Sequence, residues 1–305
     1  MRKFQELFGV KKLTFYVMLS ILRGAYLRKH AKGGRPPKIS PLDCLVITLQ
    51  YYREYRAMEH IAFDYGVWKS TVCEVIKWTE RTLIKSGAFR LPSKRALFQD
   101  ASLRVVLIDV TECETERPKK KQRQCYSGKK KKHTIKVLIV MDADSRDIIC
   151  IAISKGKTHD FKMYKDSGAH ISDVIEAVAD KGFQGLQALH ANSVIPVKAS
   201  KNHKLTAEEK KMNAKISKRR IYIEHVNRYI KRFRILSGRY RNKQKKFGLR
   251  VSLICGIYNF QHADWPSLYE NRSSKFLVIE QVYYTAKKLR IAFQSFWAAF
   301  HGFCA

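Results

Sequence analysis

The chain has 305 residues, and 60 Lys and Arg against 26 Asp and Glu give it a formal net charge of +34 at pH 7. Its 45% hydrophobic and 28% charged residues are typical of a globular protein and exclude collagen, low-complexity and wholly disordered chains. The positive charge suits a polyanionic partner, either nucleic acid or an anionic membrane face. Since no apolar run approaches the roughly 20 residues of a membrane span, we expect no membrane partner. Seven scattered cysteines without a CxxC pair predict reduced thiols in a cytoplasmic protein and no zinc site.

Residues 1–98 read as a helical DNA-binding region. Ser40 can cap a helix that begins at Pro41 and continues to about residue 55. A second helix is expected over about 57–65, before Gly66, and a third is expected after Ser70 or Thr71 as cap. The last two helices resemble a helix-turn-helix, for which a plain helical hairpin is the alternative. The candidate DNA contacts here are Lys69, Ser70, Thr71 and Lys77.

Residues 99–262 alternate between strand and helix patterns, which predicts an α/β fold. The apolar run 105–109 predicts a buried strand, and 133–141 and 147–153 predict two more strands that begin a mixed sheet in antiparallel fashion. The stretch 161–179 fits a helix as well as a strand, and 206 to about 233 predicts a long charged helix. Residues 263–305 form an aromatic-rich tail. It could pack on the core or on a partner, or it could be an altered reading frame.

Three acidic residues of the second part are candidate metal ligands. Asp109 ends an apolar strand, where a charge is costly unless it is paired or binds a metal. Asp180 ends another apolar stretch, and Glu224 lies on the cationic face of the long helix. Carboxylates at strand ends, with a third on a helix, can hold magnesium, which prefers oxygen ligands. Spacing alone does not bring the three together. The competing acids are Asp142, Asp144 and Asp160.

Several stretches of the chain match one known pattern in order and spacing. They read IDVTE at 108–112, ERPKKK at 116–121, YSGKKKKHT at 126–134, ADKGFQG at 179–185, RIYIEHV at 220–226 and KRFRI at 231–235. Over about 33–261 the chain thereby resembles the bacterial insertion-sequence transposases of the DDE class, specifically the insertion-sequence-five family. One departure is Ser217, where a wider transposase signature that includes Arg220, Glu224 and Lys231 has tyrosine.

The resemblance implies a ribonuclease H-like mixed sheet with flanking helices, on which Asp109, Asp180 and Glu224 are catalytic and bind two Mg²⁺ ions, with Mn²⁺ as a substitute. It implies cleavage at the terminal inverted repeats of an element and transfer of the freed 3′ end to target DNA. The expected partner is therefore double-stranded DNA, bound by a homodimer in a synaptic complex. We expect nucleoid association in the cytoplasm and no nucleotide cofactor.

Positive charge and the resemblance together predict where phosphates bind. A basic loop at 117–132 contributes Lys119, Lys120, Lys121, Lys129, Lys130 and Lys131. The long helix and the residues after it contribute Arg220, Arg228, Lys231, Arg232 and Arg234. We expect Glu112 to be structural. The alternative functions are a catalytically inactive repeat-binding repressor or degenerate transposase copy, and a basic RNA-binding structural protein.

Overall fold

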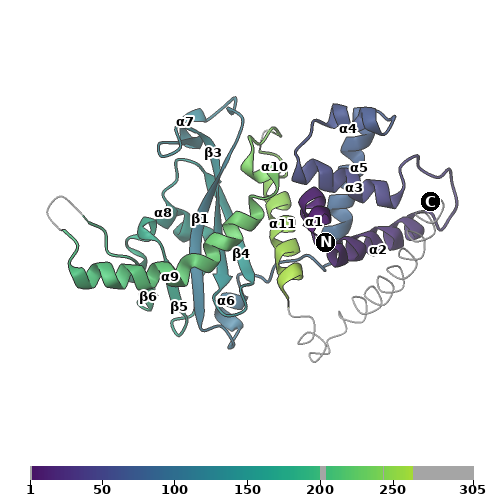
Figure 1. Ribbon diagram of the computed structural model, residues 1–305. Coiled ribbons are helices and arrows are strands. Elements are labelled where there is room, and N and C mark those ends of the chain that lie inside the picture. Colours follow the sequence, from purple (N-terminus) through teal and green to yellow (C-terminus); the bar gives the residue numbers. More distant parts are fainter. Residues whose placement is uncertain (1, 200–203, 243, 264–305) are drawn as a thin grey trace. The chain divides into compact units, whose positions relative to one another are not determined.

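The computed structural model describes residues 2–199, 204–242 and 244–263 (Figure 1). These residues belong to two compact units, one that contains the helices up to Phe89 and one that comprises Arg90–His262. The divide comes ahead of the expected boundary at residue 98, so the segment 90–98 is grouped with the sheet. Apart from Ala263, the expected aromatic tail lies outside the described residues.

Helices make up the described part of the first unit. They are α1 (Arg2–Phe8), α2 (Lys12–Lys29), α3 (Pro41–Arg53), α4 (Met58–Asp64) and α5 (Lys69–Lys85). The Ser40 side chain accepts the backbone N–H of Asp43 at 3.1 Å, which confirms the predicted cap of α3. The predicted cap of α5 is wrong, because Trp68 precedes that helix and makes no side-chain capping bond. Gly66 has φ +59°, so it provides the left-handed turn between α4 and α5.

The helical unit buries one face of α5. Val72, Ile76 and Leu83 on this helix are almost fully buried, and α5 packs against α2, α3 and α4. The buried Glu80 carboxylate accepts the Tyr52 hydroxyl at 3.1 Å, which ties α5 to α3. The spacing of the apolar residues in α5 therefore gives a helix with an inner face and a charged outer face.

The second unit is an α/β domain with one mixed sheet. Its strands are β1 (Val105–Glu114), β2 (Tyr126–Ser127), β3 (Lys132–Asp142), β4 (Ile148–Lys155), β5 (Glu176–Ala179) and β6 (Ser193–Val194). Its helices are α6 (Ala96–Gln99), α7 (Gln122–Cys125), α8 (Asp160–Ser167), η1 (Lys181–Phe183), η2 (Leu186–Ala188), α9 (Ala207–Ile230), α10 (Arg234–Ser237) and α11 (Phe247–His262). A capping box between Thr206 and Glu209 begins α9 close to where the sequence places it.

The sheet joins an antiparallel half to a parallel half at β1. Strand β3 pairs antiparallel with β1, β2 and β4, whereas β5 pairs parallel with β1 and β6. This confirms the expected ribonuclease H-like mixed sheet with flanking helices. The ambiguous stretch before Asp180 contains both predicted alternatives, because α8 precedes a short strand, β5.

Strand β1 extends well past the end of β5. The β1–β5 register ends at the pair Ile108–Ala179, while the pairing of β1 with β3 continues to Glu114. Asp109 therefore lies inside β1. The prediction that Asp109 ends this strand is wrong. Asp109 is the first residue of β1 beyond the pairing with β5, so within the described part of the chain no strand lies beside β1 on that edge from this point.

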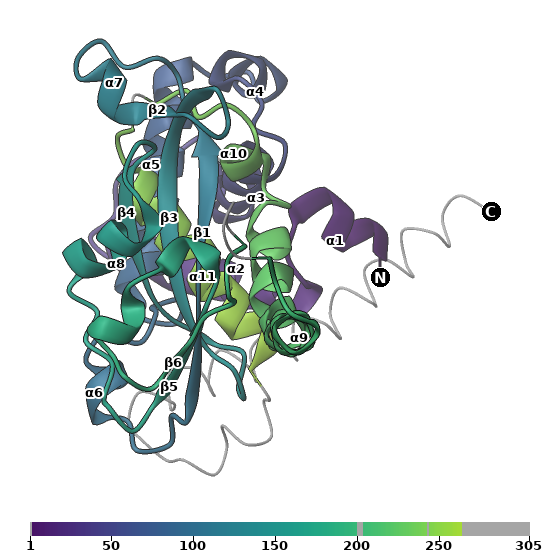
Figure 2. The same cartoon turned by 90° about the vertical axis from the view of Figure 1, so that its left-hand side faces the viewer.

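The two faces of the sheet carry different helices. Val106 and Ile108 of β1 pack with Met163 and Tyr164 of α8 in the main apolar core. Helix α9 contacts β1 and β5 and receives the side chain of Asp109. Figure 2 shows α8 and α9 on opposite sides of the sheet. Because side chains alternate along a strand, even-numbered residues of β1 face α8 and odd-numbered ones face α9.

None of the helices in the described part of the chain has the length and apolar character that crossing a bilayer requires. The cysteines within that part are all free thiols. Burial raises the pKa of Cys113 and of Cys255 to about 12.

Candidate active site

A pocket of about 870 Å³ lies where β1 continues beyond β5. Four carboxylates line it, those of Asp109, Glu112, Asp160 and Asp180. The cations that line it are Arg123, Lys129, Lys130, Lys136, Lys157 and Lys231. The cavity thus receives acidic and basic side chains from β1 and β3, from the turn after β5, from the start of α8 and from the C-terminal end of α9.

Asp109 is buried and held from α9. Its Oδ2 accepts the Asn227 side-chain amide at 2.6 Å, and its Oδ1 accepts an Arg220 guanidinium N–H at 3.2 Å. Burial raises the pKa of Asp109 to about 6, and the charges of Asp180 and Asp160 add to the rise although Arg220 opposes it. The contacts of Asp109 within the chain therefore do not fully offset the cost of burying its negative charge.

Asp180 follows β5 and caps the short helix η1. Its Oδ1 accepts the backbone N–H of Gly182 at 2.8 Å. A Cβ on Gly182 would come within 2.7 Å of Asp160 Oδ2 and 3.0 Å of Asp180 Oδ1, so a larger residue here would displace at least one of the two carboxylates. The turn after β5 thereby brings Asp160 and Asp180 together beside Asp109.

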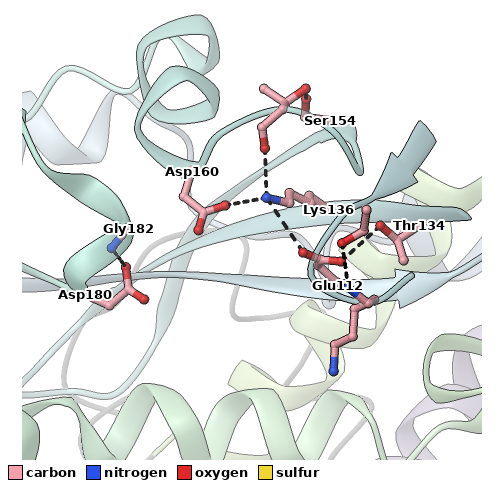
Figure 3. A network of polar contacts seen from close by, with 10 residues as sticks. Glu112, Thr134, Lys136, Ser154, Asp160, Asp180 and Gly182 are labelled. Atoms are coloured by element: carbon pink, nitrogen blue, oxygen red, sulfur yellow. Dashed lines mark hydrogen bonds and ion pairs between the residues drawn. The ribbon is translucent and has the colours of Figure 1, made fainter. Parts of the chain in front are cut away.

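Lys136 organises the other acids of the pocket (Figure 3). Its ammonium group donates to Asp160 Oδ1 and to the Thr158 carbonyl oxygen, both at 2.8 Å, and lies 3.7 Å from Glu112 Oε1. Thr134 Oγ1 donates to the second oxygen of Glu112 at 3.1 Å. Only 11% of the Lys136 side chain is exposed, so this ion pair is largely shielded from water. The expectation that Glu112 is structural agrees with these contacts.

Glu224 does not reach the pocket. Its side chain is exposed and is absent from the pocket lining. At 100° per residue, however, Glu224 lies within about 60° of Arg220, Asn227 and Lys231 around α9. The helix face that serves Asp109 therefore includes Glu224 at its solvent edge.

The donor chemistry of the pocket fits a hard divalent cation. Asp109 and Asp180 offer carboxylate oxygens, and a cation would favour the ionised form of Asp109, which burial disfavours. Two of the three predicted ligands are thus in one cavity. Across the residues that the structure describes, no group of three His, Cys, Asp or Glu side chains is arranged to hold a metal ion.

The predicted phosphate-binding residues fall into three groups. Lys129, Lys130 and Lys231 line the pocket, and Arg220 contacts Asp109. Arg228 and Arg232 line a separate cavity on another face of α9. The remaining ones in this domain are exposed outside both cavities, namely Lys119, Lys120, Lys121, Lys131 and Arg234.

In the helical unit, α4, the turn at Gly66 and α5 have the order of a helix-turn-helix. Lys69 forms an ion pair with Glu59, and Lys77 forms one with Glu74. Ser70 is exposed and Thr71 is half-buried at the start of α5. Sequence reasoning missed Phe63 and Trp68, which are 87% and 83% exposed on either side of the turn.

Sequence reasoning also missed Lys136 and Asn227, and it treated Asp160 only as a competitor for the metal site. Lys136 belongs to a sequence rich in lysine, so nothing local distinguishes it from its solvated neighbours. Asn227 lies seven positions after Arg220, which is two helical turns, and this spacing was a usable signal.

Comparisons with known proteins agree with this arrangement. Residues 108–259 match the family described as DDE superfamily endonuclease, and residues 37–89 match the helix-turn-helix of DDE superfamily endonuclease. The chain is 42% identical over 263 residues to a probable transposase for insertion sequence element IS702 from Microchaete diplosiphon, covering 86% of this chain and 95% of that protein. No solved structure matches the chain significantly. Membership of the insertion-sequence-five family stays a prediction. The chain belongs to the DDE superfamily of transposases, with a helix-turn-helix domain ahead of its endonuclease domain.

Proposed function

We propose that this transposase binds the terminal inverted repeats of its own element, cuts DNA there and joins the freed 3′ end to target DNA. The observation that carries the proposal is the convergence of Asp109 and Asp180 in one cavity walled by lysine and arginine. Asp109, Asp180 and Glu224 are the proposed catalytic acids, with two Mg²⁺ ions as cofactor. Bound divalent ions in such a site polarise the phosphoryl oxygen and activate water at neutral pH.

The chain's own residues have distinct tasks in this proposal. Arg220 and Asn227 fix the orientation of the Asp109 carboxylate. Lys129, Lys130 and Lys231 bind the phosphates next to the scissile bond, since they line the cavity. Glu224 shares a helix face with Arg220 and Lys231, and we propose that it turns toward the cavity when DNA binds.

Recognition of the repeats falls to the helix-turn-helix domain. The start of α5, with Ser70 and Thr71, is the part of such a motif that contacts base edges. Lys69 and Lys77 contact the backbone once DNA phosphates replace their present carboxylate partners. Two element ends must be held together, so we propose a homodimer that acts on the nucleoid in the cytoplasm.

The test uses the DNA that flanks the coding region. Fragments that carry its inverted repeats are incubated with the full chain and Mg²⁺, Mn²⁺ or EDTA, and nicked products are separated on a denaturing gel. We expect cleavage at the repeat ends with either metal and none with EDTA. Asp109→Asn, Asp180→Asn and Glu224→Gln should retain repeat binding and lose cleavage.

A repeat-binding repressor is the second candidate, and the exposed position of Glu224 favours it. Specific binding of the repeats without nicking in either metal would support this alternative and contradict the proposed enzyme. Cleavage that survives Asp109→Asn would instead contradict the proposed site.

A further inference from the structure

A second pocket, of about 270 Å³, lies between α9, α11 and the β3–β4 turn. Figure 1 shows α9 and α11 side by side. Arg228 and the aromatic side chains of Tyr222 and Tyr229 come from α9, Tyr258 comes from α11, and Arg146 comes from the turn. At 100° per residue, Tyr222 and Tyr229 lie nearly opposite Arg220 and Asn227 around α9. One helix thus serves two pockets with opposite faces.

The floor of this pocket is aromatic. The rings of Tyr229 and Tyr258 are 5.0 Å apart between centroids at an interplanar angle of 67°, and both residues are buried. Tyr222 is only partly buried, so its ring forms part of the rim. The guanidinium carbon of Arg146 lies 4.2 Å from the centroid of the Tyr222 ring. A cation–π pair at the mouth of an aromatic cavity provides flat surfaces on which another planar group can stack.

Arg146 is held in place by its turn. The Asp142 carboxylate accepts the backbone N–H groups of Asp144 and Ser145 at 3.2 and 3.1 Å. Arg146 itself has φ +64°, a left-handed conformation that is uncommon for a residue with a side chain. A turn that is bonded in this way keeps such a conformation and presents the guanidinium to α9.

The charge of the pocket is positive. Among the described residues, neither Arg146 nor Arg228 forms an ion pair with a carboxylate, and no carboxylate lines the cavity. Burial and the charge of Asp147 raise the pKa of Tyr258 to about 12, so its phenol stays protonated and can donate a hydrogen bond. The cavity therefore offers stacking surfaces, a hydrogen-bond donor and two guanidinium groups, those of Arg146 and Arg228, that form no ion pair among the described residues.

We propose that this second pocket binds one unpaired nucleotide of a DNA strand, with the base stacked against Tyr222 and Arg146 and its phosphate bound by Arg228. The inference rests on the proposed function, because it requires DNA at the endonuclease domain. Arginine suits the phosphate, since its fork of N–H donors matches phosphate oxygens. Aromatic and guanidinium planes are the groups on which unstacked bases settle.

Size and geometry favour an unpaired base over an intact duplex. The cavity is smaller than the about 300–1,000 Å³ of pockets for drug-sized ligands, so it admits a small planar group. Bases inside a duplex are stacked on their neighbours and cannot enter it without being extruded. Since opposite sides of a helix are about 10–12 Å apart with side chains included, one DNA molecule can contact both pockets of α9.

The experiment compares two fluorescein-labelled duplexes, one blunt and one with a single unpaired 2-aminopurine nucleotide at a 3′ end. Binding to the full chain is followed by anisotropy in EDTA, so that no cleavage takes place. We expect the unpaired nucleotide to raise affinity about tenfold, the scale of one base–aromatic stack. Quenching of the 2-aminopurine emission should accompany binding.

Variants locate the effect. Tyr222→Ala and Arg146→Gln should lose the preference and the quenching, whereas Tyr222→Phe, which keeps the ring, should retain both. Lys211→Gln with Lys215→Gln removes two exposed charges from the far half of the same helix and should leave the preference intact. Circular dichroism of each variant checks that the fold persists.

Equal affinity for the two duplexes would overturn the inference while leaving the proposed function in place. A preference that persists in a folded Tyr222→Ala chain would also overturn it, as would better competition by an RNA oligonucleotide than by DNA of the same sequence. If the wild-type chain bound neither duplex, the proposed function would fail as well.

Discussion

The acids on the two faces of β1 are held in opposite ways. Facing α9, Asp109 is buried beside further carboxylates, and its pKa is raised to about 6. Facing α8, Glu112 and Asp160 share the ammonium group of Lys136. Lys136 thus neutralises the acids on the α8 side. Asp109 has an ion pair with Arg220 at 3.2 Å, but its burial and the charges of Asp180 and Asp160 outweigh that pair, which leaves a site suited to an external cation.

The largest expected effect on the difference between the two faces comes from substitution of Asp109. We expect Asp109→Asn to reduce cleavage of element-end DNA roughly a thousandfold or more, as removal of central catalytic groups does. The unfolding free energy should change little, because removal of a buried charge whose pKa is raised offsets the loss of the ion pair with Arg220. Nicking assays and urea unfolding measure the two effects. A variant with lower stability and full cleavage would reverse the assignment of the two faces.

Lys136 is the corresponding position on the α8 side. Lys136→Met should destabilise the fold by about 3–5 kcal/mol, because it leaves Asp160 and Glu112 as shielded, unpaired charges. The matched control is Lys132→Met, which breaks the ion pair with Glu114. With 59% and 32% of those side chains exposed, we expect the control to cost less than about 1 kcal/mol. Equal midpoints in urea for the two variants would refute a structural role for Lys136.

Gly156 tests how tightly the α8 side is packed. A Cβ at this position would collide with Thr134 Oγ1, which holds Glu112, and would come within 2.8 Å of the Cys125 carbonyl oxygen. We therefore expect Gly156→Ala to cost about 1–3 kcal/mol in urea unfolding. Gly128→Ala is the control, since nothing lies within 4 Å of its Cβ, and it should stay within about 0.5 kcal/mol of wild type. A similar loss in both variants would mean that the tight contact has no energetic weight.

A partly buried carboxylate outside the candidate active site, that of Asp147, shows the effect of burial on a pKa. Asp147 lies in the β3–β4 turn, and burial together with the charge of Asp142 raises its pKa to about 6. The folded chain thus holds this proton up to a higher pH than the unfolded chain, in which the pKa is about 3.9. Stability should fall as pH rises from about 4 to about 6, and Asp147→Asn should remove this part of the pH dependence. Thermal unfolding at several pH values measures the change, and an identical profile in the variant would exclude Asp147 as its source.

Local patterns in the sequence predicted much of the fold. The β-branched run before Asp109, the cap at Ser40 and the helical spacing in α9 each gave the correct element, because the physics behind them acts over a few residues. The second half of β1 was missed, since its polar residues face the pocket and interrupt the apolar run. The strand nature of 176–179 was left open because four residues are too few to define a period.

The site was predicted less completely than the fold. The motif wording led to Asp109 and Asp180, which share the pocket, and to Glu224, which lies outside it. The partners of Asp109 and Asp160 come from positions more than 20 residues away, and one sequence contains no sign of such contacts. The pocket behind α9 was invisible for the same reason, since Arg146 and Tyr258 reach it from separate elements.

The unequal lengths of β1 and β5 also affect how firmly β1 is held in the sheet. Up to Ile108, β1 is hydrogen-bonded to a neighbour on each side, whereas from Asp109 to Cys113 its ladder in the described residues is with β3 alone. At Glu114 the backbone carbonyl accepts the N–H of Tyr240 at 2.9 Å. Amide hydrogens should therefore exchange with deuterium slowly before Asp109 and faster at alternate positions after it. We therefore expect β1 to be most rigid up to Ile108, where it anchors the sheet, and more compliant beyond it, so that the half proposed to meet DNA would adjust without loosening the core.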